Sequence, residues 1–227
     1  MRFFFSICCL ILCNLTIAQK KEAFTIRGDI KGLENNAIVY LFITGGEKLV
    51  KDSARVIKNR FLFRGYVADP CFSFIMNGNT NKLADVLLDN RTIYLRGNAP
   101  DYDSVHVSGS VIDAQWKEYY EKDIRLSGLQ HHLQYLQDSL LLHCDSTMAN
   151  LLKNDISKIV YELRIPLLRE YVNRYKNSPV GAVLVTFCLL EKNLTKMDYY
   201  KLYNQLTLPI RNSLLGQRIL KIASEKN

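Results

Sequence analysis

The stretch VHVSGSVIDAQW at residues 105–116 contains the change of hydrophobic period that decides the fold. Its first four residues alternate apolar and polar side chains, as a strand does, and Gly109 follows them. Ser110 and Asp113 then stand in the spacing of a capping box, which predicts a helix from Val111. The sequence therefore divides here into a strand-rich part and a helix-rich part.

Before this stretch, apolar residues recur at every second position. Phe24, Ile26 and Ile30 alternate with polar residues, as in a strand with one buried face. About eight short strands of this kind are predicted between residues 24 and 107. Turn-forming residues separate several of them: Gly45-Gly46, Lys58-Asn59, Asp69-Pro70, Asp89-Asn90 and Asn98-Ala99-Pro100. We expect residues 19–110 to form an antiparallel β-sandwich or barrel-like domain.

After the stretch, the apolar residues follow the helical period. The first predicted helix covers residues 111–143, with a break at Ser127-Gly128, and the second runs from Asp145 to about Lys176, with a kink or division at Pro166. Further helices are predicted to begin after Ser178, after Thr195 and at Pro209. Residues 111–227 are therefore expected to be an all-helical segment. The fold class that follows is α+β.

Residues 1–18 have the three parts of a cleavable secretory signal peptide. Arg2 is positively charged, residues 3–12 are almost entirely apolar, and Thr16 and Ala18 are small residues at the −3 and −1 positions. The apolar stretch is too short for a membrane span, which needs about 20 such residues. We expect cleavage after Ala18, export to the periplasm or cell envelope, and no stable membrane span afterwards.

A retained membrane anchor and a lipid anchor are the two alternative interpretations of residues 1–18. Lipid attachment would use Cys8, Cys9 or Cys13. The residues that precede these cysteines are not the small ones that this modification normally needs, so cleavage is favoured.

The charge of the remaining chain is moderate and spread out. After removal of the signal, 209 residues carry 29 Lys and Arg against 22 Asp and Glu, a net charge of +7. No basic run is longer than Lys20-Lys21, and no basic stripe is interleaved with aromatic residues. Nucleic-acid binding needs clustered positive charge, so we expect no nucleic-acid partner.

The cysteines and histidines do not form a chemical motif. Cys71, Cys144 and Cys188 remain after cleavage, with neither a C-x-x-C pair nor a zinc spacing, although one disulfide among them is left open. His131 and His132 are adjacent and point in different directions on a helix. We therefore predict no catalytic residue, no metal site and no cofactor.

Aromatic residues after the period change offer the one candidate interaction surface, made of Trp116, Tyr119 and Tyr199. Exposed Trp and Tyr are favoured contact residues in protein interfaces. The alternative is packing, because Trp116 and Tyr120 share a helical face that would cover the sandwich.

Several segments resemble the N-terminal domain of unknown function that precedes the thioredoxin-like domain in thiol:disulfide interchange proteins of Gram-negative bacteria, chiefly Bacteroidetes. The matching segments are FTIRGDIKG at 24–32, Asp52-Ser53, FLFRG at 61–65, VSGS at 107–110 with the Trp116 helix, Asn177-Ser178-Pro179, and RNSLLG at 211–216. Asn59 departs from the family, which commonly has glycine there.

The resemblance implies an envelope location and an accessory role, with another envelope protein or a thioredoxin-like domain as partner. In that family a W-C-x-x-C motif performs the redox chemistry, and this sequence lacks it. No catalytic residue is therefore carried over. We expect a non-catalytic protein-interaction module. A thiol–disulfide function that uses Cys71, Cys144 or Cys188, and a small-ligand carrier with a cavity between sheet and helices, remain as alternatives.

Overall fold

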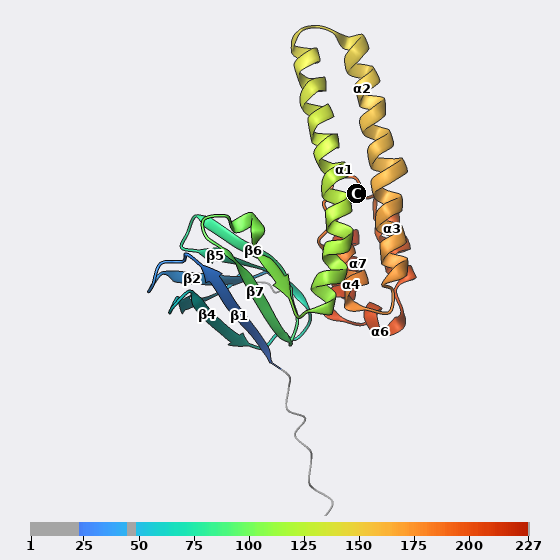
Figure 1. Ribbon diagram of the computed structural model, residues 1–227. Coiled ribbons are helices and arrows are strands. Elements are labelled where there is room, and N and C mark those ends of the chain that lie inside the picture. Colours follow the sequence, from blue (N-terminus) through green and yellow to red (C-terminus); the bar gives the residue numbers. More distant parts are fainter. Residues whose placement is uncertain (1–22, 45–48, 227) are drawn as a thin grey trace, which may run out of the picture.

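The computed structural model describes residues 23–44 and 49–226. The predicted signal peptide and the predicted Gly45-Gly46 turn lie outside these residues. A β-sandwich lies beside a body of helices, and two long helices project from that body as an arm (Figure 1). The α+β prediction is confirmed.

The strands form two four-stranded sheets. One sheet has the order β4-β1-β7-β8 and the other β3-β2-β5-β6. All neighbouring strands are antiparallel except β1 and β7, which are parallel. The strands are β1 (Phe24–Lys31), β2 (Ile38–Ile43), β3 (Val50–Arg55), β4 (Arg60–Gly65), β5 (Cys71–Asn77), β6 (Asn81–Leu88), β7 (Thr92–Asn98) and β8 (His106–Ser108).

The sandwich core follows the predicted alternation. Phe63 and Phe61 of β4 are buried opposite Ile26 and Gly28 of β1, whereas Leu62 between them is exposed. The predicted turn before β4 is confirmed, because Lys58 and Asn59 have φ of 51° and 67°. Two successive left-handed residues make a turn that matches the twist of a hairpin.

The junction between sheets and helices is compact. Gly109 has φ of +99°, and a Cβ on this residue would collide with the carbonyl of Thr92, so glycine is required here. The Ser110 hydroxyl accepts a hydrogen bond from the Asp113 N–H and caps the helix, as predicted. The Asp113 carboxylate accepts a hydrogen bond from the Leu87 N–H of β6 at 2.8 Å, which ties the start of α1 to the sheet.

The helices begin where the sequence places their caps. Asp145, Ser178 and Thr195 each cap a helix, and Thr195 with Asp198 forms the predicted capping box. The helices are α1 (Val111–Leu142), α2 (Ser146–Lys158), α3 (Ile165–Arg174), α4 (Pro179–Thr186), α5 (Lys196–Gln205), α6 (Leu208–Arg211) and α7 (Leu214–Glu225), with a π-helical segment at Ile159–Arg164.

Two helix predictions were wrong in detail. The predicted break at Ser127-Gly128 is absent, because α1 runs without interruption through both residues. Pro209 opens only the four-residue α6, and Ser213 caps α7 instead. At Pro166 only the type of helix changes: the backbone stays right-handed helical from α2 through the π-helical segment, which ends at Arg164, into α3. The proline, which lacks an N–H, lies in the first turn of α3.

The helical core extends onto the sandwich. Leu87 of β6 belongs to the core of the helices, and Phe72 of β5 packs against it. Trp116 of α1 meets Phe72 edge to face, with ring centroids 5.5 Å apart, and stacks on Tyr120 at 5.0 Å. The predicted packing of this helix face onto the sandwich is therefore confirmed.

Candidate interaction surface

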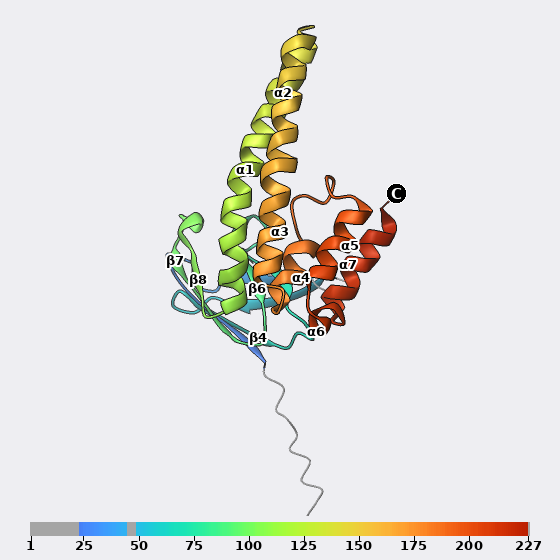
Figure 2. The ribbon, with the colours of Figure 1, turned by 90° about the vertical axis from the view of Figure 1, so that its right-hand side faces the viewer.

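The arm is the most unusual part of the surface. We define it as residues 124–158, the upper part of α1 with α2, which stands clear of the rest of the protein in both ribbon views (Figures 1 and 2). Along α1, leucines recur at alternating spacings of three and four residues, the heptad pattern by which helices pack on one another. We call this row the leucine stripe: Leu126, Leu129, Leu133, Leu136 and Leu140.

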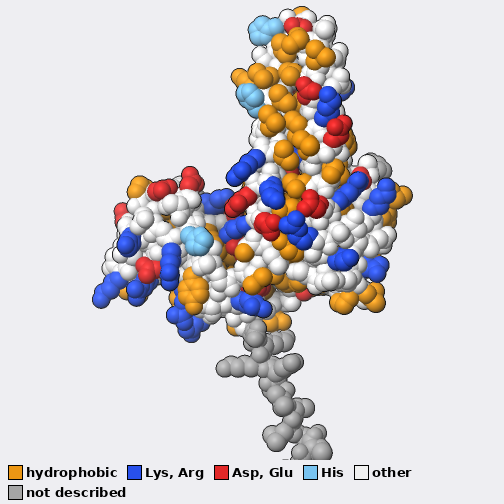
Figure 3. Space-filling view, turned by 45° about the vertical axis from the view of Figure 1, so that its right-hand side comes forward, with side chains coloured by type: hydrophobic (Ala, Val, Ile, Leu, Met, Phe, Trp, Pro, Cys, Tyr) orange, Lys and Arg blue, Asp and Glu red, His pale blue; other side chains and the backbone are white. Residues whose placement is uncertain are grey.

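The leucine stripe is only partly covered within the chain. Leu129 is 48% exposed and Leu136 is 38% exposed. The other three leucines are half-buried. Apolar side chains run along the projecting arm in the space-filling view (Figure 3). Monomeric proteins seldom expose large contiguous apolar patches, so the stripe is a candidate contact surface.

A buried arginine explains why the leucines are left outside. Arg164 ends the π-helical segment and is 1% exposed. Its Nε and Nη2 donate to the Asp123 carboxylate at 2.7 Å and 2.8 Å, and its Nη1 donates to Gln130 Oε1 at 2.6 Å. A buried guanidinium needs such partners. Asp123 and Gln130 share one face of α1, so meeting Arg164 turns this polar face inward.

The polar face continues up the arm. Ser127 is buried between Asp123 and Gln130, and Gln137 Nε2 donates to the Ala149 carbonyl of α2 at 3.2 Å. Polar contacts thus occupy the side of α1 that a simple helical hairpin would fill with leucine. The leucine stripe consequently flanks the contact with α2 instead of filling it.

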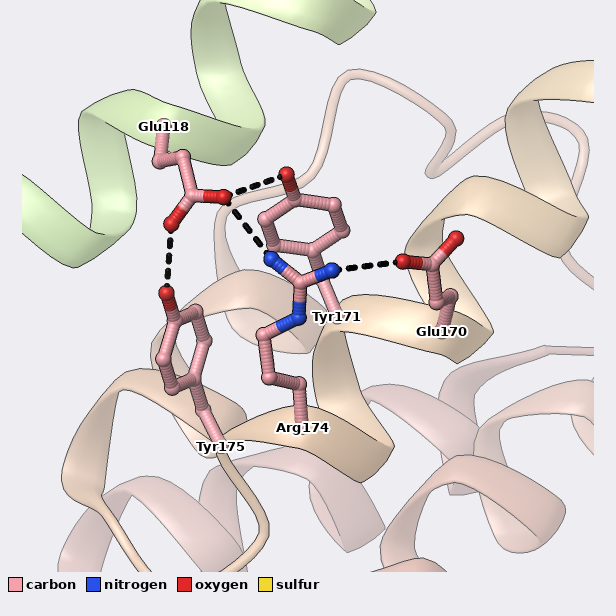
Figure 4. A network of polar contacts seen from close by, with 5 residues as sticks. All are labelled: Glu118, Glu170, Tyr171, Arg174 and Tyr175. Carbon is pink, nitrogen blue, oxygen red and sulfur yellow. Dashed lines mark hydrogen bonds and ion pairs between the residues drawn. The ribbon is translucent and has the colours of Figure 1, made fainter.

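A second set of polar contacts fixes the base of α1 to α3 (Figure 4). The Glu118 carboxylate accepts hydrogen bonds from the hydroxyls of Tyr175 and Tyr171 at 2.7 Å and 2.8 Å, and from Arg174 Nη1 at 2.8 Å. Arg174 also pairs with Glu170. The bonds from Tyr175 and Tyr171 lower the pKa of Glu118. These contacts hold α1 against the helical body below the arm.

The arm carries no net charge. Arg125, Lys153 and Lys158 are balanced by Asp138, Asp145 and Asp155. The whole chain has a formal charge of +8, so the arm is a neutral, apolar projection from a basic protein. Two such projections do not repel one another.

The structure places the three aromatic residues of the predicted surface in its interior. Trp116, Tyr119 and Tyr199 are 5%, 3% and 1% exposed, and all three belong to the core of the helices. Of the two interpretations that the sequence offers for these aromatic residues, packing and contact with a partner, their burial agrees with packing. The arm was not foreseen, although the spacing of the leucines was visible in the sequence.

Two of the three cysteines in the described part of the chain are poorly reactive. All three are free thiols. Burial raises the pKa of both Cys71 and Cys188 to about 11, so neither forms much of the thiolate that disulfide exchange requires. Cys144 is exposed in the turn between α1 and α2.

Other candidate chemistry is also unsupported in the described part of the chain. No group of three or more His, Cys, Asp or Glu side chains there is arranged to hold a metal ion. The His143 Nδ1 lies 2.8 Å from the carbonyl oxygen of Ser139, so the ring is engaged with the backbone. Between the sandwich and α7 a pocket of about 220 Å³ is lined by Cys71 and Leu215 among others, which is smaller than typical ligand pockets of about 300–1,000 Å³.

Comparison with known proteins identifies only the sheet-rich part. Residues 24–116 match a family described as "Domain of unknown function (DUF4369)". The match covers the strands of the sandwich and reaches Trp116 of α1. No curated protein matches the chain. Among the described residues, no helix has the length and apolar character needed to cross a membrane.

Proposed function

We propose that this protein is an exported, non-catalytic protein of the cell envelope that acts through protein–protein contact, and that its arm pairs with the arm of a second copy. The partly exposed leucine stripe carries the proposal. Two helical hairpins that bring such stripes together make a four-helix bundle, in which each stripe is buried.

The size of the arm suits this pairing. From Ile124 to Leu142, α1 rises about 28 Å, and two helices side by side are about 20 Å wide. One face of the arm therefore offers on the order of 560 Å² per copy, or about 1,100 Å² in the pair. A specific interface buries at least about 1,000 Å². A two-fold axis would bring identical faces together, and the neutral charge of the arm permits this.

The envelope location is supported by the sequence features of residues 1–18. The accessory role is supported by the resemblance to the N-terminal part of thiol:disulfide interchange proteins. The match to a domain of unknown function is compatible with that relationship and adds no activity to it. An arm-to-arm pair would leave both sandwiches free for a further partner, either another envelope protein or a thioredoxin-like domain.

The oligomeric state of the chain tests the pairing, with light scattering after size exclusion as the measurement. We expect a dimer that dissociates on dilution. Leu129→Glu with Leu136→Glu places unpaired charges in the proposed interface, so the dissociation constant should rise about a hundredfold or more. N-terminal sequencing of protein from a periplasmic fraction tests export, with Gln19 expected as the first residue.

The matched control is Leu189→Glu with Leu208→Glu, two leucines outside the arm that are 47% and 61% exposed. This control should remain a dimer. A wild-type chain that stays monomeric at high concentration contradicts the pairing. If the arm variant then loses binding to a different protein or to lipid vesicles, that ligand covers the stripe instead.

A thiol–disulfide function is the less favoured alternative. It requires a thiolate, and burial raises the pKa of Cys71 and Cys188 to about 11. Of the three thiols in the described part of the chain, Cys144 is the exposed one.

A further inference from the structure

A groove lies on the outer face of the β4-β1-β7-β8 sheet. It has a volume of about 420 Å³ and opens to solvent on the side of the sheet that faces away from the sandwich core. Its wall contains four arginines and one carboxylate, together with exposed apolar side chains. The charged residues are Arg27, Arg55, Arg60, Arg96 and Asp29.

The strand register orders these side chains in two rows. In the first row Arg27 of β1 stands between Leu62 of β4 and Tyr94 of β7. Leu62 and Tyr94 are 44% and 40% exposed. An arginine flanked by an exposed leucine and an exposed tyrosine has the composition of an interface centre, where Arg and Tyr are enriched.

In the second row Asp29 of β1 stands between Arg60 of β4 and Arg96 of β7. Arg60 Nε lies 3.3 Å from Asp29 Oδ2, and both side chains are largely solvated. Asp29 thus neutralises one arginine of the groove. His106 of β8 extends this row beyond Arg96.

Three arginines of the groove lack a carboxylate partner within the described part of the chain: no ion pair there involves Arg27, Arg55 or Arg96. With Arg60 paired to Asp29, four positive charges against one negative leave the groove with a net charge of +3. Basic side chains are visible over the sandwich in Figure 3. The charge of the groove is therefore complementary to a ligand that carries carboxylates.

We infer that this groove binds an extended acidic segment of a partner protein. Arg27 and Arg96 lie on neighbouring strands and are offset by two residues along the strand direction. Strand geometry therefore places their Cα atoms about 8 Å apart. In an extended segment, acidic side chains two residues apart lie about 6.6 Å apart on one face, within reach of both arginines. A guanidinium binds a carboxylate with two parallel hydrogen bonds, and the apolar side chains of the segment would lie on Leu62 and Tyr94.

The same observations disfavour a phosphate polymer. Asp29 sits in the middle of the arginine row, where it would repel a continuous line of phosphates. The arginines are also too few and too localised to follow a nucleic-acid backbone. A short carboxylate segment with apolar residues matches both the charge and the exposed leucine and tyrosine.

The probe for this site is a fluorescent peptide in which glutamate alternates with leucine and valine. The same peptide with glutamine in place of glutamate is the ligand control. Fluorescence anisotropy with the full chain at low salt should show saturable binding of the glutamate peptide, and about tenfold weaker binding of the glutamine peptide. Binding should weaken as salt is added.

The variant is Arg27→Gln with Arg96→Gln, which should weaken binding of the glutamate peptide about tenfold or more. Its matched control is Lys201→Gln with Lys221→Gln, an equal change of charge at two exposed positions on α5 and α7, outside the arm. This control should bind within about twofold of the wild type. Circular dichroism checks that both variants are folded.

Three results would overturn the inference. The first is absence of peptide binding to the wild-type chain, and the second is an equal loss in the variant and its control, which would mean that only net charge matters. The third is tighter binding of a single-stranded oligonucleotide or of anionic lipid vesicles than of the peptide, lost in the same variant. The groove test does not depend on the arm, because Leu129→Glu with Leu136→Glu should leave peptide binding unchanged.

Discussion

Arg164 is the residue on which the shape of the arm depends. It is buried with Asp123 and Gln130, and its three hydrogen bonds orient the polar face of α1 inward. Removing one partner of a buried ion pair leaves an uncompensated charge, which is costlier than losing both partners. The pair therefore specifies how α1 is rotated, at a stability cost that apolar residues would avoid.

We predict that Arg164→Met lowers the free energy of unfolding by about 3–5 kcal/mol, because the Asp123 carboxylate remains buried and unpaired. Arg164→Met with Asp123→Leu should be less destabilising than Arg164→Met alone, since no charge is then left behind. Urea denaturation followed by circular dichroism measures both.

The exposed pair Lys158–Asp155 supplies the control, because Lys158→Met should change stability by about 1 kcal/mol or less. A double variant as destabilised as Arg164→Met alone, or more so, would show that the unpaired Asp123 carboxylate is not the source of the loss, against the role assigned to the pair.

At the scale of elements, the helix starts and strand faces were accessible from sequence because their causes are local. Ser110, Asp145, Ser178 and Thr195 cap helices through bonds to residues two or three positions away. The left-handed turn at Lys58-Asn59 is likewise local. Such features depend on neighbours in the chain, so pattern alone identifies them.

The features that sequence missed depend on distant partners. Ser127-Gly128 suggested a break, yet Ser127 is buried inside an uninterrupted α1. The exposure of the leucine stripe follows from a bond between residues 41 positions apart, Arg164 and Asp123, which no spacing rule reveals.

The contact between α1 and α3 should depend on pH through Glu118. Its pKa is lowered in the folded protein, so its stabilising contribution is present above the pKa of the unfolded chain, about 4.3, and is lost as pH falls through the lowered folded value. We predict that the wild type is more stable than Glu118→Gln at neutral pH and that this difference disappears in acid. Thermal unfolding of both proteins across this pH range measures it.

Glu121→Gln is the control for this substitution, because Glu121 is an exposed acid on the same helix, outside these contacts. It should show no such pH-dependent difference. A Glu118→Gln effect that persisted unchanged in acid would mean that the charge of Glu118 is not what holds α1 to α3.

At the scale of the molecule, the sandwich has an apolar core of its own and is joined to the core of the helices through β5 and β6. Leu87 of β6 is buried among the helices, its N–H donates to the Asp113 carboxylate of α1, and Phe72 of β5 packs on Trp116. Separating the two parts would expose these groups together. The predicted division at residue 110 therefore marks a change of secondary structure, and we expect the two sides of it to unfold together.

Trp116 is the one tryptophan in the sequence and lies at this junction, so its fluorescence reports on the contact directly. We predict that fluorescence and far-UV circular dichroism give the same urea midpoint, as a two-state transition requires.

Asp113→Ala removes the acceptor of the buried Leu87 N–H and should lower the free energy of unfolding by about 1–3 kcal/mol, moving both midpoints equally. Asp155→Ala on exposed α2 should move neither. Measuring all of these in the Leu129→Glu, Leu136→Glu background keeps arm pairing from making the midpoints concentration-dependent. A fluorescence transition that precedes the loss of helical signal would mean that the junction opens first and that the sandwich and the helical segment are separate folding units.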